Sequence, residues 1–328
     1  MLYGLLKGIR TLSVMGMCKN AGKTTVLNSL IGECGARGEL LGLTSIGRDG
    51  ERSDLVTNTK KPEIFVQEGT LIATAETLLK EGDISLEVLD TTGLPTPMGQ
   101  IVIVRARSAG FVQLGGASIT EHQKLLRDSL FGFGAERVII DGALSRKSLG
   151  APALCDGVIL SSGASYDPDI RLTAEDTAYF ARLFTLPGYN GPASDTRFTA
   201  VKAGECSGAE ELNPLIPRLK EGAEALVIRG AVTDSTAAAL ANIGKLLKDT
   251  LIVCEDASRL LLKRASFEKL MRFTRGAAVL NETRLIAVTV NPFSAYGTHY
   301  DKDEFRERVA SALESAGLRI PVLDVKDV

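Results

Sequence analysis

The chain alternates short apolar, β-branched runs with segments of helical periodicity, and this alternation limits the folds open to it. Residues 11–15 are typical of a buried strand. Within 23–34, one helical face collects the apolar side chains Val26, Leu27, Leu30 and Ile31. We expect further strands at 40–46, 84–89, 101–104, 137–140 and 158–160, and helices at 119–131 and 171–184. The pattern predicts an α/β fold, a mostly parallel sheet with flanking helices.

The densest cluster of chain-breaking residues lies at 187–194, where Pro, Gly, Asn and Ser dominate. We place a linker there, with one domain at 1–186 and a second α/β domain, available to bind a partner, at 195–328. The rhythm then restarts, with strands expected at 225–228, 251–254, 285–290 and 321–325, and helices at 235–247, 258–273 and 303–316. The sequence leaves open whether this half forms its own sheet or extends the first.

Composition excludes several classes of protein. Lys and Arg total 38 against 40 Asp and Glu, so the chain has no basic excess for extended nucleic-acid binding. Five scattered cysteines and two histidines give no zinc-binding pattern, which favours reduced thiols. No apolar run reaches the roughly 18 residues of a membrane span, so we expect a protein of the cytoplasm with no membrane partner.

Ten residues between the first predicted strand and helix carry the clearest chemical signal. Gly22 lets the backbone bend around an anion, Lys23 can bind β- and γ-phosphates, and the Thr24 hydroxyl suits Mg²⁺. Lys19 offers a second basic contact or a solvated side chain. The predicted phosphate-binding set is Gly16, Lys19, Asn20, Ala21, Gly22, Lys23, Thr24 and Thr25. One departure stands out, because Met17 occupies the position of the usual first glycine and Gly16 comes one residue earlier.

A bound triphosphate also needs carboxylates for the metal and for the attacking water. Asp90 follows a hydrophobic strand and precedes Gly93, so we predict that Asp90 binds the metal and that Gly93 senses the γ-phosphate. Asp141 has the same form after 137–140 and is the second candidate for the metal, or a contact to a partner. Asp49 follows the second predicted strand, and we expect it to position the attacking water.

The base of the nucleotide is less well indicated. No Asn-Lys-x-Asp element for guanine is present, which favours ATP and leaves GTP open. Asn291 and Pro292 follow the predicted strand 285–290, where a strand-ending turn is a better interpretation than a base contact.

The segment Lys-Asn-x-Gly-Lys-Thr-Thr at 19–25, with the Asp-x-x-Gly element at 90–93, resembles a family of P-loop NTPases. It is similar to the molybdopterin-guanine-dinucleotide accessory proteins, whose group includes the signal-recognition-particle GTPases and metal-insertion chaperones. The resemblance implies a P-loop fold, bound Mg²⁺ and nucleotide hydrolysis stimulated by a protein partner.

A closer resemblance, resting on 45–51 and 138–148, is to the reactivase subunits associated with adenosylcobalamin-dependent lysine 5,6-aminomutase. It implies a chaperone-like accessory subunit that ejects damaged cobalamin from the mutase together with a second ATPase subunit. The chain has no Asp-x-His-x-x-Gly cobalamin motif. An ATP-dependent small-molecule kinase or ligase of a cofactor pathway is the alternative, and a nucleotide-binding scaffold without hydrolysis is a third. The oligomeric state stays open.

Overall fold

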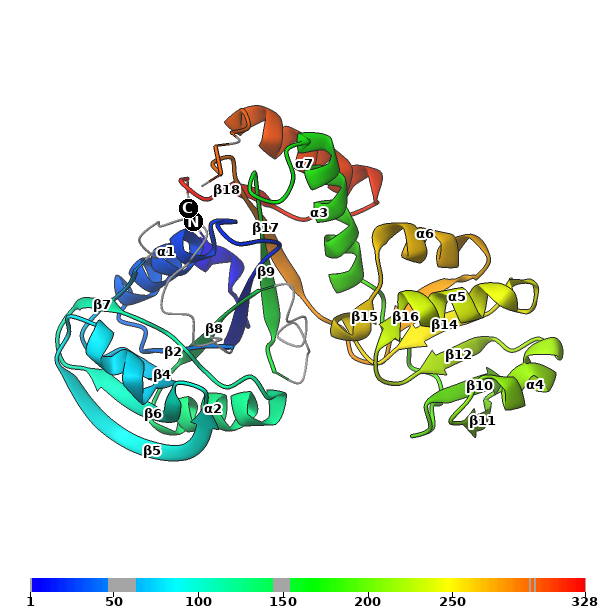
Figure 1. The fold of residues 1–328 in the computed structure, drawn as a ribbon, viewed down its shortest axis with the longest axis horizontal. Coiled ribbons are helices and arrows are strands. Elements are labelled where there is room, and N and C mark those ends of the chain that lie inside the picture. The colour runs from blue at the N-terminus through cyan, green and yellow to red at the C-terminus, as the bar shows by residue number, and fades with distance from the viewer. Residues whose placement is uncertain (1, 47–62, 144–153, 295, 298, 328) are drawn as a thin grey trace. The chain divides into compact units, whose positions relative to one another are not determined.

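The computed structural model describes residues 2–46, 63–143, 154–294, 296–297 and 299–327. It divides the chain into two compact units (Figure 1). The first unit comprises Met1–Ala181 and Arg284–Val328, and the second comprises Arg182–Thr283. Each has its own sheet and its own hydrophobic core.

The described residues of the first unit form a nine-stranded sheet, and seven neighbouring strands of it, from β18 to β4, are parallel. This confirms the mostly parallel α/β sheet that the sequence predicts. In spatial order the strands are β18 (Val322–Asp324), β17 (Leu285–Asn291), β9 (Gly157–Gly163), β1 (Thr11–Gly16), β8 (Arg137–Ala143), β2 (Leu41–Ser45), β4 (Leu71–Ala75), β6 (Gly99–Ala106) and β5 (Leu86–Thr96).

Helices cover both faces of this sheet. On one face, α1 (Lys23–Gly35) packs its apolar side chains against Leu41 and Leu43 of β2 in the main core. Gly42 points to the other face, where its Cβ position lies 3.1 Å from Leu130 Cβ of α2 (Thr120–Gly132). Helices α3 (Ile170–Phe184) and α7 (Lys302–Ser315) complete the set in this part of the chain. Since β1 is buried along its whole length between β8 and β9, its carboxyl end lies at the middle of the sheet edge.

The far edge of the sheet differs from expectation. Strand β6 runs antiparallel to both of its neighbours, β4 and β5. Strand β3 (Ile64–Val66) pairs separately with β7 (Gly110–Val112), also antiparallel. The strand expected at 84–89 does not end at Asp90. It continues to Thr96, with Asp90 opposite Ile103 of β6.

The second unit is built on a smaller sheet. Its described strands lie in the order β11 (Glu205–Ala209), β10 (Phe198–Lys202), β12 (Ala225–Ile228), β14 (Leu251–Cys254) and β16 (Gly276–Val279). A short parallel pair joins β13 (Val232–Thr233) and β15 (Leu260–Leu261). The helices are α4 (Ile216–Lys220), α5 (Asp234–Asn242) and α6 (Arg264–Arg272).

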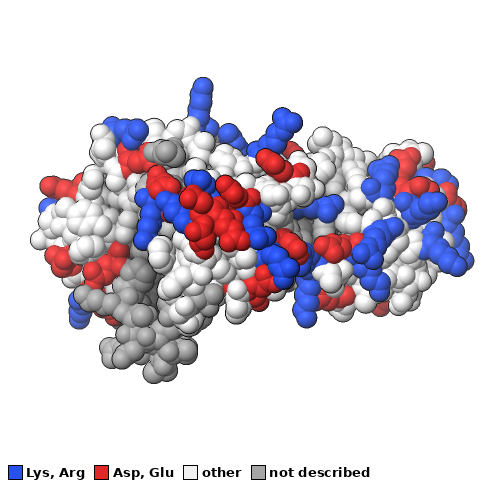
Figure 2. All heavy atoms as spheres, turned by 90° about the horizontal axis from the view of Figure 1, so that it is seen from above, with Lys and Arg blue, Asp and Glu red and all other residues white. Residues whose placement is uncertain are grey.

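The predicted second domain, 195–328, therefore extends too far toward the C-terminus. Residues after Thr283 return to the first unit, because β17 pairs with β9 and β18 pairs with β17. The first domain, expected at 1–186, is correspondingly discontinuous. Within the described part of the chain, every helix is too short or too polar to cross a membrane. On the face drawn in Figure 2, acidic and basic side chains are interspersed.

Candidate functional site

A tight loop joins β1 to α1 at the carboxyl edge of the sheet (Figure 1). Two of its residues adopt left-handed backbone conformations, Asn20 with φ 61° and Gly22, the residue before the helix, with φ 91°. Asparagine and glycine are the residues that tolerate this region best. Alternating conformations of this kind turn successive backbone N–H groups toward one concave side, where an anion can bind.

Lys23, the first residue of α1, folds back over the end of β1. A Cβ atom on Gly16 would lie 2.8 Å from Lys23 Cδ and 2.9 Å from Lys23 Nζ. Any side chain at position 16 would therefore displace the lysine. This close approach explains why a glycine stands at position 16, one residue before the usual place. It also sets the Lys23 ammonium at the mouth of the loop, beside the positive end of the helix.

Neighbouring strands hold the loop in this shape. The Met17 N–H donates to the Ser161 carbonyl oxygen on β9 at 2.9 Å, and Asn291 Nδ2, at the end of β17, donates to the Asn20 carbonyl oxygen at 2.8 Å. Ala21 is fully buried, and its Cα would lie 2.9 Å from a Cβ on Gly163. The Asn291 side chain thus holds the backbone of the loop at Asn20. The sequence alone does not indicate this contact.

Of Asp90 and Asp141, the two candidates for the metal, Asp141 is the one that the fold brings to the loop. It lies near the end of β8, opposite Val14 of β1, and on the α1 face of the sheet. Its Oδ1 atom is buried and has no hydrogen-bond partner among the described residues. Burial raises the pKa of this carboxyl, and the charge of Lys23 acts in the opposite direction.

The donor set at this edge fits a magnesium ion. The free Asp141 oxygen and the Thr24 hydroxyl in the first turn of α1 are hard oxygen ligands of the kind Mg²⁺ prefers. Within the described residues, no three His, Cys, Asp or Glu side chains gather to hold a metal by themselves. Phosphate oxygens and water would have to complete the coordination, as is usual for Mg²⁺.

The structure does not bring Asp90 and Gly93 to the loop. Both lie on β5, where Asp90 is exposed. Between β1 and β5 the sheet interposes β8, β2, β4 and β6, and five strand spacings amount to about 24 Å. The assignment of Asp90 to the metal and of Gly93 to the γ-phosphate is therefore corrected, because their strand is at the antiparallel edge. Asp49 lies outside the described residues.

The remaining loop residues have varied exposure. Lys19 and Thr25 are exposed, while Cys18 is partly buried. Burial raises the pKa of the Cys18 thiol to about 11, with Lys23 acting in the opposite direction. The thiol is consequently protonated at neutral pH and is a poor nucleophile.

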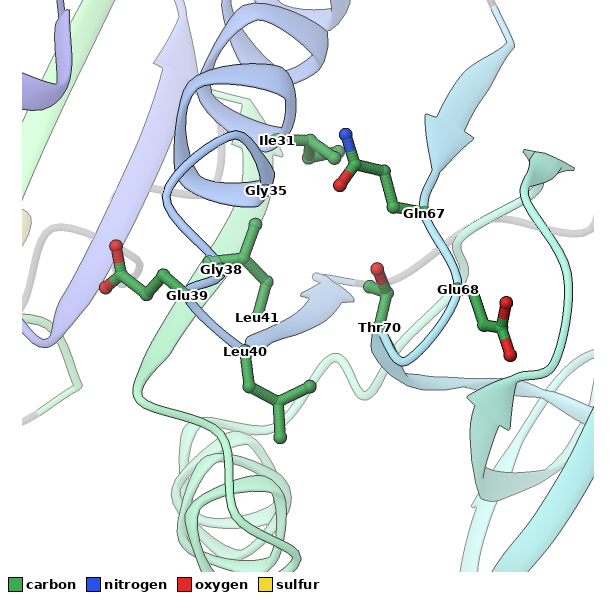
Figure 3. Close-up of a pocket in the computed structure, with 9 residues that line it drawn as sticks. All are labelled: Ile31, Gly35, Gly38, Glu39, Leu40, Leu41, Gln67, Glu68 and Thr70. Carbon is green, nitrogen blue, oxygen red and sulfur yellow. The ribbon is translucent and has the colours of Figure 1, made fainter.

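A cavity of about 130 Å³ lies at the other end of α1 (Figure 3). It is lined by Ile31, Gly35, Gly38, Glu39, Leu40, Leu41, Gln67, Glu68 and Thr70. The carboxylates of Glu39 and Glu68 point away from Gln67 and Thr70. Since the 13 residues of α1 span about 20 Å, this cavity is separate from the loop.

The left-handed turn of the loop, the Lys23 side chain and the unpartnered Asp141 oxygen thus bring to one edge of the sheet the kinds of group that suit a phosphate chain and a cation. No protein-family model, curated protein or solved structure matches the chain.

Proposed function

We propose that residues 16–25 are the phosphate-binding loop of a magnesium-dependent nucleoside triphosphatase, with ATP favoured as substrate and GTP as the second choice. The observation that supports this most directly is the position of Lys23, the first residue of α1, over the end of β1 and near Asp141 on the adjacent strand β8. Lys23 Nζ lies over Gly16, and the orphaned Asp141 oxygen is close enough for the Lys23 charge to influence its pKa. The positive charge of Lys23 suits a phosphate group, and the negative charge of Asp141 suits the cation that accompanies it.

The chain's own residues would act on the phosphates by charge and position. The loop amides and Lys23 would hold the β- and γ-phosphates and balance the charge that develops as the bond to the bridging oxygen breaks. Water adds to the γ-phosphorus, which yields a nucleoside diphosphate and inorganic phosphate. Asp141 and Thr24 would hold Mg²⁺, which neutralises phosphate charge when bound. Asp49 stays the predicted residue for orienting the water.

The proposed role is that of a cytoplasmic accessory subunit, possessing a partner-binding unit at Arg182–Thr283. Its partner would be a cobalamin-dependent aminomutase, with a second ATPase subunit taking part in reactivation. The insertion of a separately folded unit between α3 and β17 supports an action on a partner. The first strand after that unit, β17, ends at Asn291, whose side chain contacts the loop.

Phosphate release from Mg-ATP tests the proposal, with and without the aminomutase. We expect turnover in the wild type, stimulation by the mutase, and loss of turnover in Lys23→Ala. Lys7→Ala removes an exposed lysine of the same unit and serves as the matched control. Circular dichroism should show both variants folded. Turnover that is unchanged in Lys23→Ala contradicts the proposal, and turnover that requires a metabolite acceptor identifies a kinase or ligase.

A further inference from the structure

The loops after β17 and β18 flank one side of the phosphate loop. Asn291 bonds the Asn20 carbonyl oxygen, and a Cβ on Gly22 would lie 2.7 Å from Val325 Cγ1. These two loops lie on the opposite side from Asp141, because β9 and β17 follow β1 in one direction along the sheet and β8 lies in the other. From β8 to β17 is about 14 Å of sheet edge.

The order of the strands determines how a bound nucleotide would be oriented along the edge of the sheet. A cation held by Asp141 of β8 draws the terminal phosphates that share it to the β8 side of the loop. The nucleoside, at the other end of the phosphate chain, is then directed toward the loops after β17 and β18. This step rests on the proposed function, since it takes the phosphates as bound at residues 16–25.

The loop after β17 carries an exposed aromatic ring, that of Phe293. The Phe293 side chain, two residues beyond Asn291, is 47% exposed. Lys326, two residues beyond the end of β18, places its Nζ atom 3.9 Å from the centroid of the Phe293 ring. His299 meets the same ring edge-on, with centroids 5.6 Å apart. The loops after two different strands thus meet at the Phe293 ring, which stays partly exposed although the Lys326 ammonium lies over one of its faces.

The polar groups of Asn291 are already used inside the protein. Its Nδ2 donates to the Asn20 carbonyl oxygen, and its Oδ1 accepts the Phe293 N–H at 3.3 Å. A base at this place would therefore meet the ring and the lysine rather than the Asn291 amide. Stacking on a ring is tolerant of base identity, because every base has a π-face.

We propose that Phe293 and Lys326 form the platform for the nucleobase, and that the site selects purines by stacking area instead of reading the base edge. ATP and GTP should then bind with affinities within about threefold of each other, and CTP should bind more weakly than either, because its single ring covers less of the platform.

Calorimetric titration of the full chain with Mg-ATP, Mg-GTP, Mg-CTP and magnesium tripolyphosphate tests this. In Phe293→Ala we expect the affinity for ATP and GTP to fall about fivefold or more, as for the loss of one stacked base. The affinity for tripolyphosphate should stay unchanged. Phe111→Ala, which truncates an exposed ring on the separate β3–β7 pair, is the control and should change neither.

Three outcomes would overturn the inference while leaving the phosphate loop in place. They are unchanged nucleotide affinity in Phe293→Ala, an equal loss for nucleotides and tripolyphosphate, and wild-type discrimination between ATP and GTP above about tenfold. If the wild type binds neither nucleotide nor tripolyphosphate, the proposed function fails, and the platform fails with it.

Discussion

Asp141 and Asp90 have the same sequence context and very different positions in the fold. Asp141 lies beside the loop, while Asp90 is exposed on the edge strand β5. We predict that Asp141→Asn lowers magnesium-dependent turnover by roughly 100-fold, the usual effect of removing one charge-stabilising group. Asp90→Asn should stay close to wild type. Steady-state rates of phosphate release compare the two variants. A larger loss of turnover in Asp90→Asn than in Asp141→Asn would mean that Asp90, on β5, binds the metal.

The same carboxylate should cost stability when no nucleotide is bound. Burial raises the folded-state pKa of Asp141 above its unfolded value, so ionisation on raising the pH opposes folding. At pH 7 we expect Asp141→Asn to unfold with a free energy about 1 kcal/mol higher than wild type, because a buried amide is less costly than a buried charge. The gap should close as the pH falls toward the unfolded carboxyl pKa. Urea titrations at several pH values measure it, and a less stable Asn variant at pH 7 would refute the argument.

At the scale of elements, the turn into α1 depends on Gly22. An alanine there has to hold φ near 91° and also meets Val325 Cγ1 at 2.7 Å. Gly38 has a similar φ of 71°, but a Cβ on it would meet no atom within 4 Å. We predict a loss of about 1 kcal/mol in the free energy of unfolding for Gly38→Ala and about 3 kcal/mol for Gly22→Ala. Equal losses would mean that the contact with Val325 is unimportant.

Several central elements could be predicted from sequence because their signals are local. The strand–loop–helix of β1 and α1 is found within one residue of the expected bounds, and β12 and β14 match them. The helix expected at 258–273 is shorter, since residues before Arg264 form β15. The strands β3, β4, β7, β10, β11 and β16 had no prediction, because runs this short do not show a clear period.

The site was predictable only where it is continuous in sequence. Residues 16–25 follow from spacing, but Ser161 and Asn291 meet the loop through sheet pairing, which a single sequence does not encode visibly. A hydrophobic run precedes both Asp90 and Asp141 in the sequence, although of their two strands, β5 and β8, only β8 lies next to β1. The sequence also did not show that β17 belongs to the first sheet, because parallel strands have similar sequences whichever sheet they join.

At the scale of the whole molecule, two cores predict two cooperative units. Mg-ATP bound at residues 16–25 should stabilise the first unit alone, by about 2.7 kcal/mol at a hundredfold excess over Kd. Hydrogen exchange would show this as slower exchange in β1, α1 and β8, with β12 and β14 unchanged. Equal protection of both sheets would mean that the chain unfolds as one unit.

Equilibrium titration of the purified chain with Mg-ATP addresses the phosphate loop most directly, with Lys23→Ala measured in parallel. We predict saturable binding at one site per chain in the wild type. In Lys23→Ala we predict binding weaker by an order of magnitude or more, roughly the value of a lost charge-assisted contact. Absence of binding in the wild type, or equal affinity in the two proteins, would contradict it.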